Sequence, residues 1–320
     1  MTIGILGAGA FGTALAVTLA QDGHDIRLWA RDPATVDAIR ATRRAPRLPQ
    51  VELPLGIEPT NDVAWAMEPD VLLFAVPAQA LFPFLSENGH RVGDRAIVAC
   101  CKGIDIASMT GPSATLARHC PDATVAVLTG PSFANDIAKG LPTALTLACT
   151  DDSAGVDLQQ RLSTRSLRLY RSGDLIGADL GGALKNVMAI ACGACIGAGY
   201  GDSARAALLT RGFAEMTRFA TLHGAKAETL MGLSGLGDLM LTCSSELSRN
   251  FRFGLRLGEG GSFDEDVTVE GAKTAIAVQK IAEAKGLDLP ISSVVARLVK
   301  NEISVEQALK GLLSRPLKEE

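Results

Sequence analysis

Short apolar runs alternate with longer amphipathic segments through the first half of the chain. Most of these runs have no period of two, which is typical of parallel strands covered by helices on both faces. The runs lie at residues 3–6, 26–29, 71–76, 96–101, 124–128, 144–149 and 167–170. This alternation predicts βαβ units that build an α/β domain with a doubly wound, mostly parallel sheet.

After residue 173 the β-type runs stop, and long segments rich in alanine and leucine replace them. Helices are predicted at residues 174–198, 202–223, 226–232, 248–258, 270–285 and 291–311. An all-α C-terminal domain follows. Because 320 residues are enough to bury two cores, we expect two domains, at 1–180 and 181–320. No low-complexity linker marks the boundary, which allows a helix to run directly out of the first domain.

Composition places the chain among ordinary globular proteins, with 47% hydrophobic and 21% charged residues. The net charge of −4 provides no general cationic field that would attract nucleic acid or anionic lipid. We therefore expect no nucleic-acid partner, and any anion site must be local. No unbroken run of about 18 apolar residues predicts a membrane span, and no basic segment precedes the apolar stretch at 14–20. The predicted location is cytoplasmic.

The seven cysteines are odd in number and scattered through apolar stretches, which favours reduced thiols over a disulfide framework. Cys192 and Cys195 form a C-x-x-C, but no second pair accompanies them, so core packing is favoured over zinc binding or redox chemistry. The four histidines show no metal-ligand spacing. We predict no metal site and find no context for a hydrolase triad.

A glycine-rich turn, Gly7-Ala8-Gly9-Ala10-Phe11-Gly12, lies between the first predicted strand and a helix at 13–21. This is the context that the dinucleotide fingerprint of a Rossmann domain requires. Gly7 would permit the tight turn, Gly9 would let a pyrophosphate approach the backbone, and Gly12 would let helix and strand pack closely. We therefore predict dinucleotide binding, although such turns also arise for purely structural reasons.

Arg31 stands at the end of the second strand, where NAD-preferring domains carry an acidic residue for the ribose hydroxyls. A guanidinium there can bind a ribose 2′-phosphate through two hydrogen bonds, which favours NADP(H) over NAD(H). The adjacent Asp32 keeps NAD(H) open, and it could equally cap a helix that begins at Pro33.

Lys185 is the single charged residue between Leu180 and Tyr200. Apolar surroundings strip hydration from a lysine, which lowers its pKa and suits it to proton transfer near neutral pH. A lysine that extends to solvent at a helix edge is the competing interpretation, and the residue alone favours it.

Three other polar clusters interrupt apolar context. Lys102 and Ser132 follow predicted strands, where open α/β sheets collect ligands, but a surface lysine and a helix-capping serine fit equally well. Residues 248–250 could bind a substrate or cap a surface helix. The glycine-rich stretch at 232–237 has no preceding strand, so we predict a tight turn that presents Asp238 to the cleft.

Together these residues resemble the bacterial-type, NAD(P)-dependent glycerol-3-phosphate dehydrogenase family, and the resemblance runs from Ile3 to beyond Pro290. The segments that carry it are residues 7–15, Cys101-Lys102-Gly103, Thr129-Gly130-Pro131-Ser132-Phe133-Ala134, Leu180-Gly181-Gly182-Ala183-Leu184-Lys185-Asn186, Gly235-Leu236-Gly237-Asp238 and Ser248-Arg249-Asn250.

The resemblance implies a Rossmann domain followed by a helical domain, and reduction of dihydroxyacetone phosphate to sn-glycerol 3-phosphate, the precursor of phospholipid backbones. It implies Lys185 as the catalytic acid/base and a homodimer as the assembly. The implied substrate contacts are Lys102, Gly130, Ser132, Asp238, Ser248, Arg249 and Asn250. The implied cofactor contacts, which include residues of the glycine turn, are Gly7, Gly9, Ala10, Phe11, Gly12, Arg31, Lys102, Ala134, Arg249, Val269 and Glu270.

Two positions depart from the family pattern: Asp136 stands where glutamate is usual, and Ser203 where asparagine is common. Both lie outside the matched site residues. Two other functions remain as alternatives, namely a related dehydrogenase acting on a hydroxy acid or sugar acid, and a non-catalytic regulator that binds NADPH.

Overall fold

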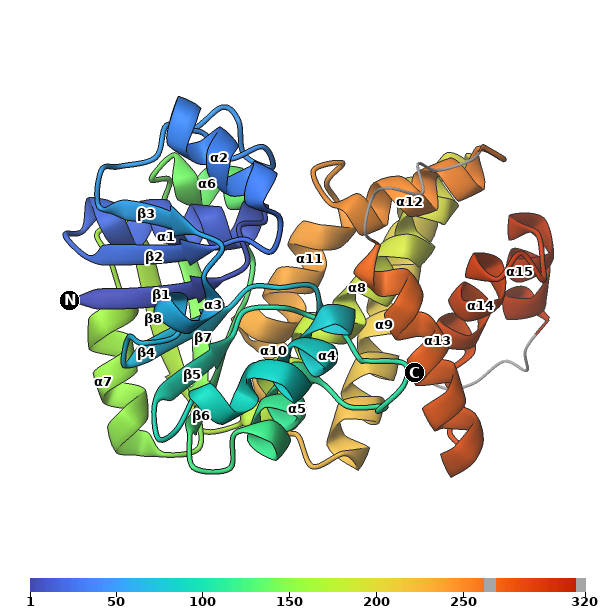
Figure 1. Cartoon of the computed structure of the whole chain (residues 1–320). Helices are drawn as coiled ribbons and strands as arrows, with labels where there is room; N and C mark the ends of the chain where they lie inside the picture. The colour runs from blue at the N-terminus through green and yellow to red at the C-terminus, as the bar shows by residue number, and fades with distance from the viewer. Residues whose placement is uncertain (262–268, 315–320) are drawn as a thin grey trace.

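The computed structural model describes residues 1–261 and 269–314. An eight-stranded sheet with helices on both faces forms one side of the molecule, and a group of helices forms the other (Figure 1). The strands are β1 (Thr2–Leu6), β2 (Asp25–Trp29), β3 (Ile57–Thr60), β4 (Val71–Phe74), β5 (Ala96–Ala99), β6 (Thr124–Thr129), β7 (Thr143–Cys149) and β8 (Leu167–Ser172). Their order is β3-β2-β1-β4-β5-β6-β7-β8, and only the β6–β7 pair is antiparallel. The predicted doubly wound, mostly parallel sheet is confirmed.

Strand β3 is the one strand that the apolar pattern missed. It is four residues long and reads Ile-Glu-Pro-Thr, so it carries neither an apolar run nor an alternation. Its position at the edge of the sheet, paired only with β2, is where a proline can be tolerated.

Helices cover both faces of the sheet. One face packs against α1 (Ala10–Gln21), α2 (Pro33–Thr42), α6 (Ala134–Ala138) and α7 (Asp152–Leu162). The opposite face packs against α3 (Val63–Ala66), α4 (Ala78–Asn88), α5 (Pro112–His119) and the start of α8. The short 3-10 helix η1 (Gly89–Arg91) follows α4. Burial on both faces explains why the central strands read as unbroken apolar runs.

The second half of the described chain is helical. Its elements are α8 (Leu175–Gly197), α9 (Gly201–Leu222), α10 (Ala227–Met231), the π-helix η2 (Leu233–Gly237), α11 (Asp238–Cys243), α12 (Arg249–Gly258), α13 (Glu270–Lys285), α14 (Pro290–Val299) and α15 (Val305–Leu313). Helix α8 crosses the boundary predicted at residue 180, because it starts on the sheet and continues into the helical region (Figure 1).

The single helix predicted at 291–311 is wrong, since the chain forms α14 and α15 there. Asn301 adopts a left-handed backbone conformation that ends the first helix. Ser304 then starts the second with a capping box, in which its hydroxyl accepts from the Gln307 N–H and the Gln307 side chain accepts from the Ser304 N–H.

Helix α8 is the core of the helical region. Its length and apolar composition would be enough to cross a membrane, but 83% of its most apolar 18-residue stretch is buried inside the protein. Cys192 and Cys195 are both buried on it, which confirms the core-packing interpretation of the C-x-x-C.

Glycines bring α8 and α12 into backbone contact. A Cβ on Gly193 would lie 2.1 Å from the Phe251 carbonyl oxygen, and a Cβ on Gly254 would lie 2.1 Å from the Ile190 carbonyl oxygen. Helix α12 can therefore approach α8 only because both surfaces are bare at this crossing. The approach matters for function, because α8 carries Lys185 and α12 begins at Arg249.

At the opposite end, α8 is tied to the sheet side by a buried carboxylate. Asp179 accepts hydrogen bonds from the N–H and hydroxyl of Ser113 at the start of α5, a helix whose own cap residue, Gly111, has no side chain. Burial raises the pKa of Asp179 to about 6, while the Ser113 hydrogen bonds oppose that rise. Helix α8 is thus anchored on both sides of Lys185.

Substitution of Gly193 by alanine is expected to force α12 away from α8. Overpacking of this kind costs about 1–3 kcal/mol, which outweighs the gain in helix propensity. Urea denaturation should show a loss of about 2 kcal/mol in unfolding free energy. Gly311 on α15 is the matched control, because its Cβ would meet nothing within 4 Å. Gly311→Ala should be neutral or slightly stabilising, and equal effects of the two variants would contradict the close approach.

Candidate active site

Several of the predicted site residues follow the carboxyl ends of parallel strands in the sheet. Strands β1, β4, β5 and β6 run parallel, so their carboxyl ends meet at the same edge. The strand order reverses between β1 and β4, which is the crevice where open α/β sheets bind ligands. The glycine turn follows β1, Lys102 follows β5, and Gly130 follows β6.

The glycine turn has the geometry that its sequence predicts. Gly7 has φ +124°, and a Cβ there would lie 2.8 Å from the backbone of Ala75. A Cβ on Gly12 would lie 2.1 Å from the Gly7 carbonyl oxygen, so the helix packs directly on the turn. Gly9 precedes α1, and a Cβ there would meet nothing within 4 Å, which leaves open space at a helix N-terminus without a side-chain cap. These features fit the pyrophosphate of a dinucleotide.

A buried carboxylate joins two lysines that come from different parts of the chain. The Lys185 ammonium lies 2.7 Å from Oδ1 of Asp238, and the Lys102 ammonium lies 2.6 Å from Oδ2 of the same side chain. Asp238 is fully buried, and Lys185 is 7% exposed. Two ammonium groups against one carboxylate leave a net positive charge at this buried point, which suits an anionic ligand.

The environment of Lys185 shifts its pKa. Burial lowers the pKa of Lys185 to about 8, and the nearby Lys102 charge adds to this effect, while Asp238 opposes it. Because the Lys185 side chain is buried and its ammonium is paired with Asp238 and Thr242, the interpretation of Lys185 as a lysine that extends to solvent is wrong. A group with a pKa near 8 can both donate and accept a proton close to neutral pH.

The stretch before Asp238 is not the tight turn that we predicted. Residues Leu233–Gly237 form a π-helical segment that continues into α11, so Asp238 begins a helix. Such segments are frequent at functional sites. Thr242 lies one turn further along α11, where its hydroxyl accepts from the Lys185 ammonium at 2.7 Å and is 3.3 Å from Oδ1 of Asp238.

Lys102 and Ser132 do not fit the alternative interpretations of a surface lysine and a helix-capping serine. The Lys102 side chain is 16% exposed, and its ammonium also donates to the Gly130 carbonyl oxygen at 3.2 Å, so it is no surface lysine. Helix α6 takes Phe133 as its N-cap, so Ser132 does not cap it. The Ser132 hydroxyl is within 3.4 Å of the Gly130 carbonyl oxygen instead.

Residues 248–250 form the start of α12 beside α8. Ser248 caps the helix, because its hydroxyl accepts from the Phe251 N–H at 3.2 Å. Asn250 donates to Oδ1 of Asn186 at 2.9 Å and accepts from the Gly271 N–H at 2.9 Å. The Asn250 side chain thus links α8, α12 and α13.

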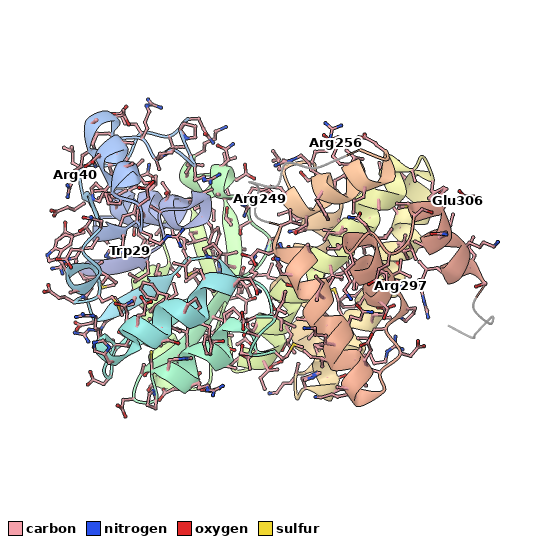
Figure 2. The ribbon with its side chains drawn as sticks, turned by 45° about the vertical axis from the view of Figure 1, so that its right-hand side comes forward. Trp29, Arg40, Arg249, Arg256, Arg297 and Glu306 are labelled. Carbon is pink, nitrogen blue, oxygen red and sulfur yellow. The ribbon has the colours of Figure 1, made fainter. Side chains whose placement is uncertain are left out.

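Arg249, the first residue of α12, lies on the side of the helical region that faces the sheet (Figure 2). Its charge attracts that of Glu270, the first residue of α13. Burial lowers the pKa of Arg249 and raises the pKa of Glu270, and their attraction opposes both changes. Glu270 also accepts from the Ala78 N–H at 3.2 Å, at the start of α4. Residues predicted to contact a cofactor therefore bridge the two halves of the molecule.

Arg31 is exposed just after β2, and the adjacent Asp32 accepts from the Ala34 N–H at 3.0 Å. The capping interpretation of Asp32 is thus confirmed, and Arg31 and Asp32 are both exposed charged residues at this strand end. Ala134 is the first residue of α6, and Val269 immediately precedes α13.

Sequence reasoning missed Thr242 and gave Asn186 no role, although both touch site residues. A signal existed for each: Thr242 is four residues from Asp238 and so shares its helix face, and Asn186 directly follows Lys185. Among the described residues, no group of three or more histidine, cysteine, aspartate or glutamate side chains could hold a metal ion.

Comparison with known proteins decides the family. The models for the N-terminal and C-terminal parts of NAD-dependent glycerol-3-phosphate dehydrogenase match residues 2–155 and 174–310. The chain belongs to this family. It is 58% identical over 320 residues to the glycerol-3-phosphate dehydrogenase [NAD(P)+] of Paracoccus denitrificans, with 100% of both chains covered. The crystal structure of the Coxiella burnetii glycerol-3-phosphate dehydrogenase is similar at TM-score 0.93 and 35% identity, covering 98% of this chain and 99% of that one.

More distant structures share the fold alone. A ketopantoate reductase from Ralstonia eutropha has TM-score 0.62 and 16% identity, with 97% of this chain covered. A Rossmann domain followed by helices thus occurs in dehydrogenases of several specificities, and the site must distinguish among them.

Replacement of Asp238 by alanine is expected to leave two buried ammonium groups without a carboxylate. Loss of one partner from a buried ion pair costs about 3–5 kcal/mol. This loss of unfolding free energy should be smaller at about pH 9.5 than at about pH 7. Burial lowers the pKa of Lys185 to about 8 in the folded protein, so at the higher pH the lysine is neutral and no longer needs a counter-charge. Urea denaturation at both pH values measures it.

The matched control is Asp157→Ala, which removes an exposed ion pair with Arg161. It should cost less than about 1 kcal/mol at either pH. A loss for Asp238→Ala that is equally small, or that does not change with pH, would contradict the role of Asp238 as the shared counter-charge.

Proposed function

We propose that this chain reduces dihydroxyacetone phosphate to sn-glycerol 3-phosphate with a nicotinamide dinucleotide, and catalyses the reverse reaction. The observation that carries the proposal is the buried Lys102–Asp238–Lys185 cluster beside a dinucleotide turn. Its full-length relatives carry the name glycerol-3-phosphate dehydrogenase, which supports this substrate. The product supplies the backbone of glycerophospholipids.

The cofactor would lie along the carboxyl ends of β1, β2 and β4. We assign its binding to the residues that the sequence predicts, which are Gly7, Gly9, Ala10, Phe11, Gly12, Arg31, Lys102, Ala134, Arg249, Val269 and Glu270. The relatives' names include both NAD and NADP. Arg31 favours NADP(H), because its exposed guanidinium is free of the Asp32 side chain, which caps α2. NAD(H) remains an acceptable cofactor.

The substrate would lie between the sheet edge and the start of α12. We assign its polar contacts to Lys102, Gly130, Ser132, Asp238, Ser248, Arg249 and Asn250. Within the described residues, the N–H groups of α12 have partners in the helix only from Phe251 onward. Two N–H groups and the Arg249 side chain can therefore meet a phosphate at this helix N-terminus. A local cationic site explains how an acidic protein binds a phosphorylated substrate.

Lys185 is the proposed acid in the reduction. When bound, the nicotinamide supplies the hydride. The Lys185 ammonium, held by Asp238 and Thr242, donates its proton to the carbonyl oxygen of the substrate, so that no full negative charge develops on that oxygen. Lys102 adds a second positive charge next to the same carboxylate. In the reverse reaction the neutral Lys185 amine accepts the hydroxyl proton.

The alternatives make different predictions. A hydroxy-acid or sugar-acid dehydrogenase would oxidise NADPH with another carbonyl substrate, and a regulator would bind NADPH without consuming it. A cytoplasmic location and a homodimer remain predictions from composition and from the family resemblance.

Lys185→Ala is expected to lower the rate of NADPH oxidation with dihydroxyacetone phosphate by about 10²- to 10⁴-fold, because it removes the proton donor. NADPH binding, followed by its fluorescence, should persist. In the wild type, kcat for reduction should fall as pH rises through about 8, since the protonated lysine is the active form, and kcat for oxidation should rise over the same range.

The control is Lys280→Ala, which removes an exposed lysine on α13. It should leave both rates unchanged. Near-normal turnover of Lys185→Ala would overturn the assignment of Lys185, and a wild type that consumes NADPH only with a hydroxy-acid precursor would overturn the proposed substrate. The same assay with NADH tests the predicted preference for NADPH.

A further inference from the structure

The loop that follows Lys102 is held by one side chain from α4. Gln79, the second residue of that helix, donates from Nε2 to the Ile104 carbonyl oxygen at 2.9 Å. Its Oε1 accepts from the Ile106 N–H at 3.2 Å. Both ends of the amide are thus used on backbone groups two and four residues beyond Lys102.

The same loop is fixed on its other side by the helical region. The Ile104 N–H lies 3.4 Å from the Thr274 hydroxyl, and the Ile104 side chain is buried in the core that surrounds α8. Gly103 has φ +152°, and a Cβ there would lie 3.1 Å from Ala78 and 3.3 Å from Glu270. The backbone after Lys102 is therefore held in one position between α4 and α13.

We propose that Gln79 is a positioning residue that places the Lys102 ammonium against Asp238, an inference that rests on the proposed function. Gln79 is absent from the predicted site, and its two hydrogen bonds go to the backbone of Ile104 and Ile106, not to Asp238 or Lys185. It acts through the loop: the amide fixes Ile104 and Ile106, and these fix the backbone from which the Lys102 side chain reaches Asp238 and Gly130.

This placement has an electrostatic consequence at Lys185. The groups facing the Lys185 ammonium are Asp238, Thr242 and Cys243 from α11, and Lys102 from the loop. Lys102 lowers the pKa of Lys185 and also occupies one oxygen of Asp238. If the loop relaxes and Lys102 moves away, its repulsion of the Lys185 ammonium weakens and Asp238 pairs with Lys185 alone. Both effects raise the pKa of Lys185.

The test is Gln79→Met, which keeps the length of the side chain and removes both hydrogen bonds. We expect the KM for dihydroxyacetone phosphate to rise about tenfold or more, because a misplaced binding group costs one to two orders of magnitude. The fall of kcat with pH in the reduction direction should move to higher pH than in the wild type.

A double-mutant cycle shows whether Gln79 acts through Lys102. In a Lys102→Ala background, Gln79→Met should have no further effect on the KM or on the pH profile. Full additivity of the two substitutions would overturn the proposal. If Gln79→Met is too unstable to assay, Gln79→Glu, which keeps an acceptor for the Ile106 N–H, replaces it with the same expectations.

Gln159→Met is the matched control, because Gln159 also donates from Nε2 to a backbone carbonyl, that of Leu169, at 2.8 Å and at the far edge of the sheet. It should lower the melting temperature without changing KM or the pH profile. A Gln79 variant that behaves like this control would show a merely structural role and overturn the inference alone. A wild type inactive on dihydroxyacetone phosphate would overturn the proposed function, and the inference with it.

Discussion

The site depends on one fully buried carboxylate that two lysines share. Asp238 gives one oxygen to Lys185 and the other to Lys102, and these three residues come from α11, α8 and the loop after β5. Buried charges persist only when they are paired and hydrogen-bonded. If Asp238 paired with one lysine alone, the other lysine would lose its counter-charge. The sheet half and the helical half must therefore meet in one arrangement.

Most of the fold serves to hold that arrangement. Helix α8 is tied to α5 by Asp179 and lies against α12 through bare glycine backbone, so Lys185 is fixed from both sides. Asn250 links α12 to α8 and α13, and Glu270 reaches back from α13 to α4. The residues that we assign to substrate and cofactor therefore stand on elements that constrain one another.

Local patterns in the sequence predicted those features that depend on neighbours in the chain. The buried strands, the glycine turn and the isolated charge of Lys185 belong to this group. The patterns failed where tertiary contacts decide. Strand β3 exists because β2 offers it an edge, and the helix break at Asn301 is a single left-handed residue. The Lys102–Asp238 pair joins residues 136 positions apart, and no spacing reveals it.

The most direct test is the ionisation of Lys185, measured by NMR of protein labelled with ¹³C at the lysine side chains. The Lys185 signal is assigned by its absence in Lys185→Arg. A midpoint near pH 8 is the result that burial beside Asp238 and Lys102 predicts. A midpoint above about pH 10, as in an exposed lysine, would contradict the account.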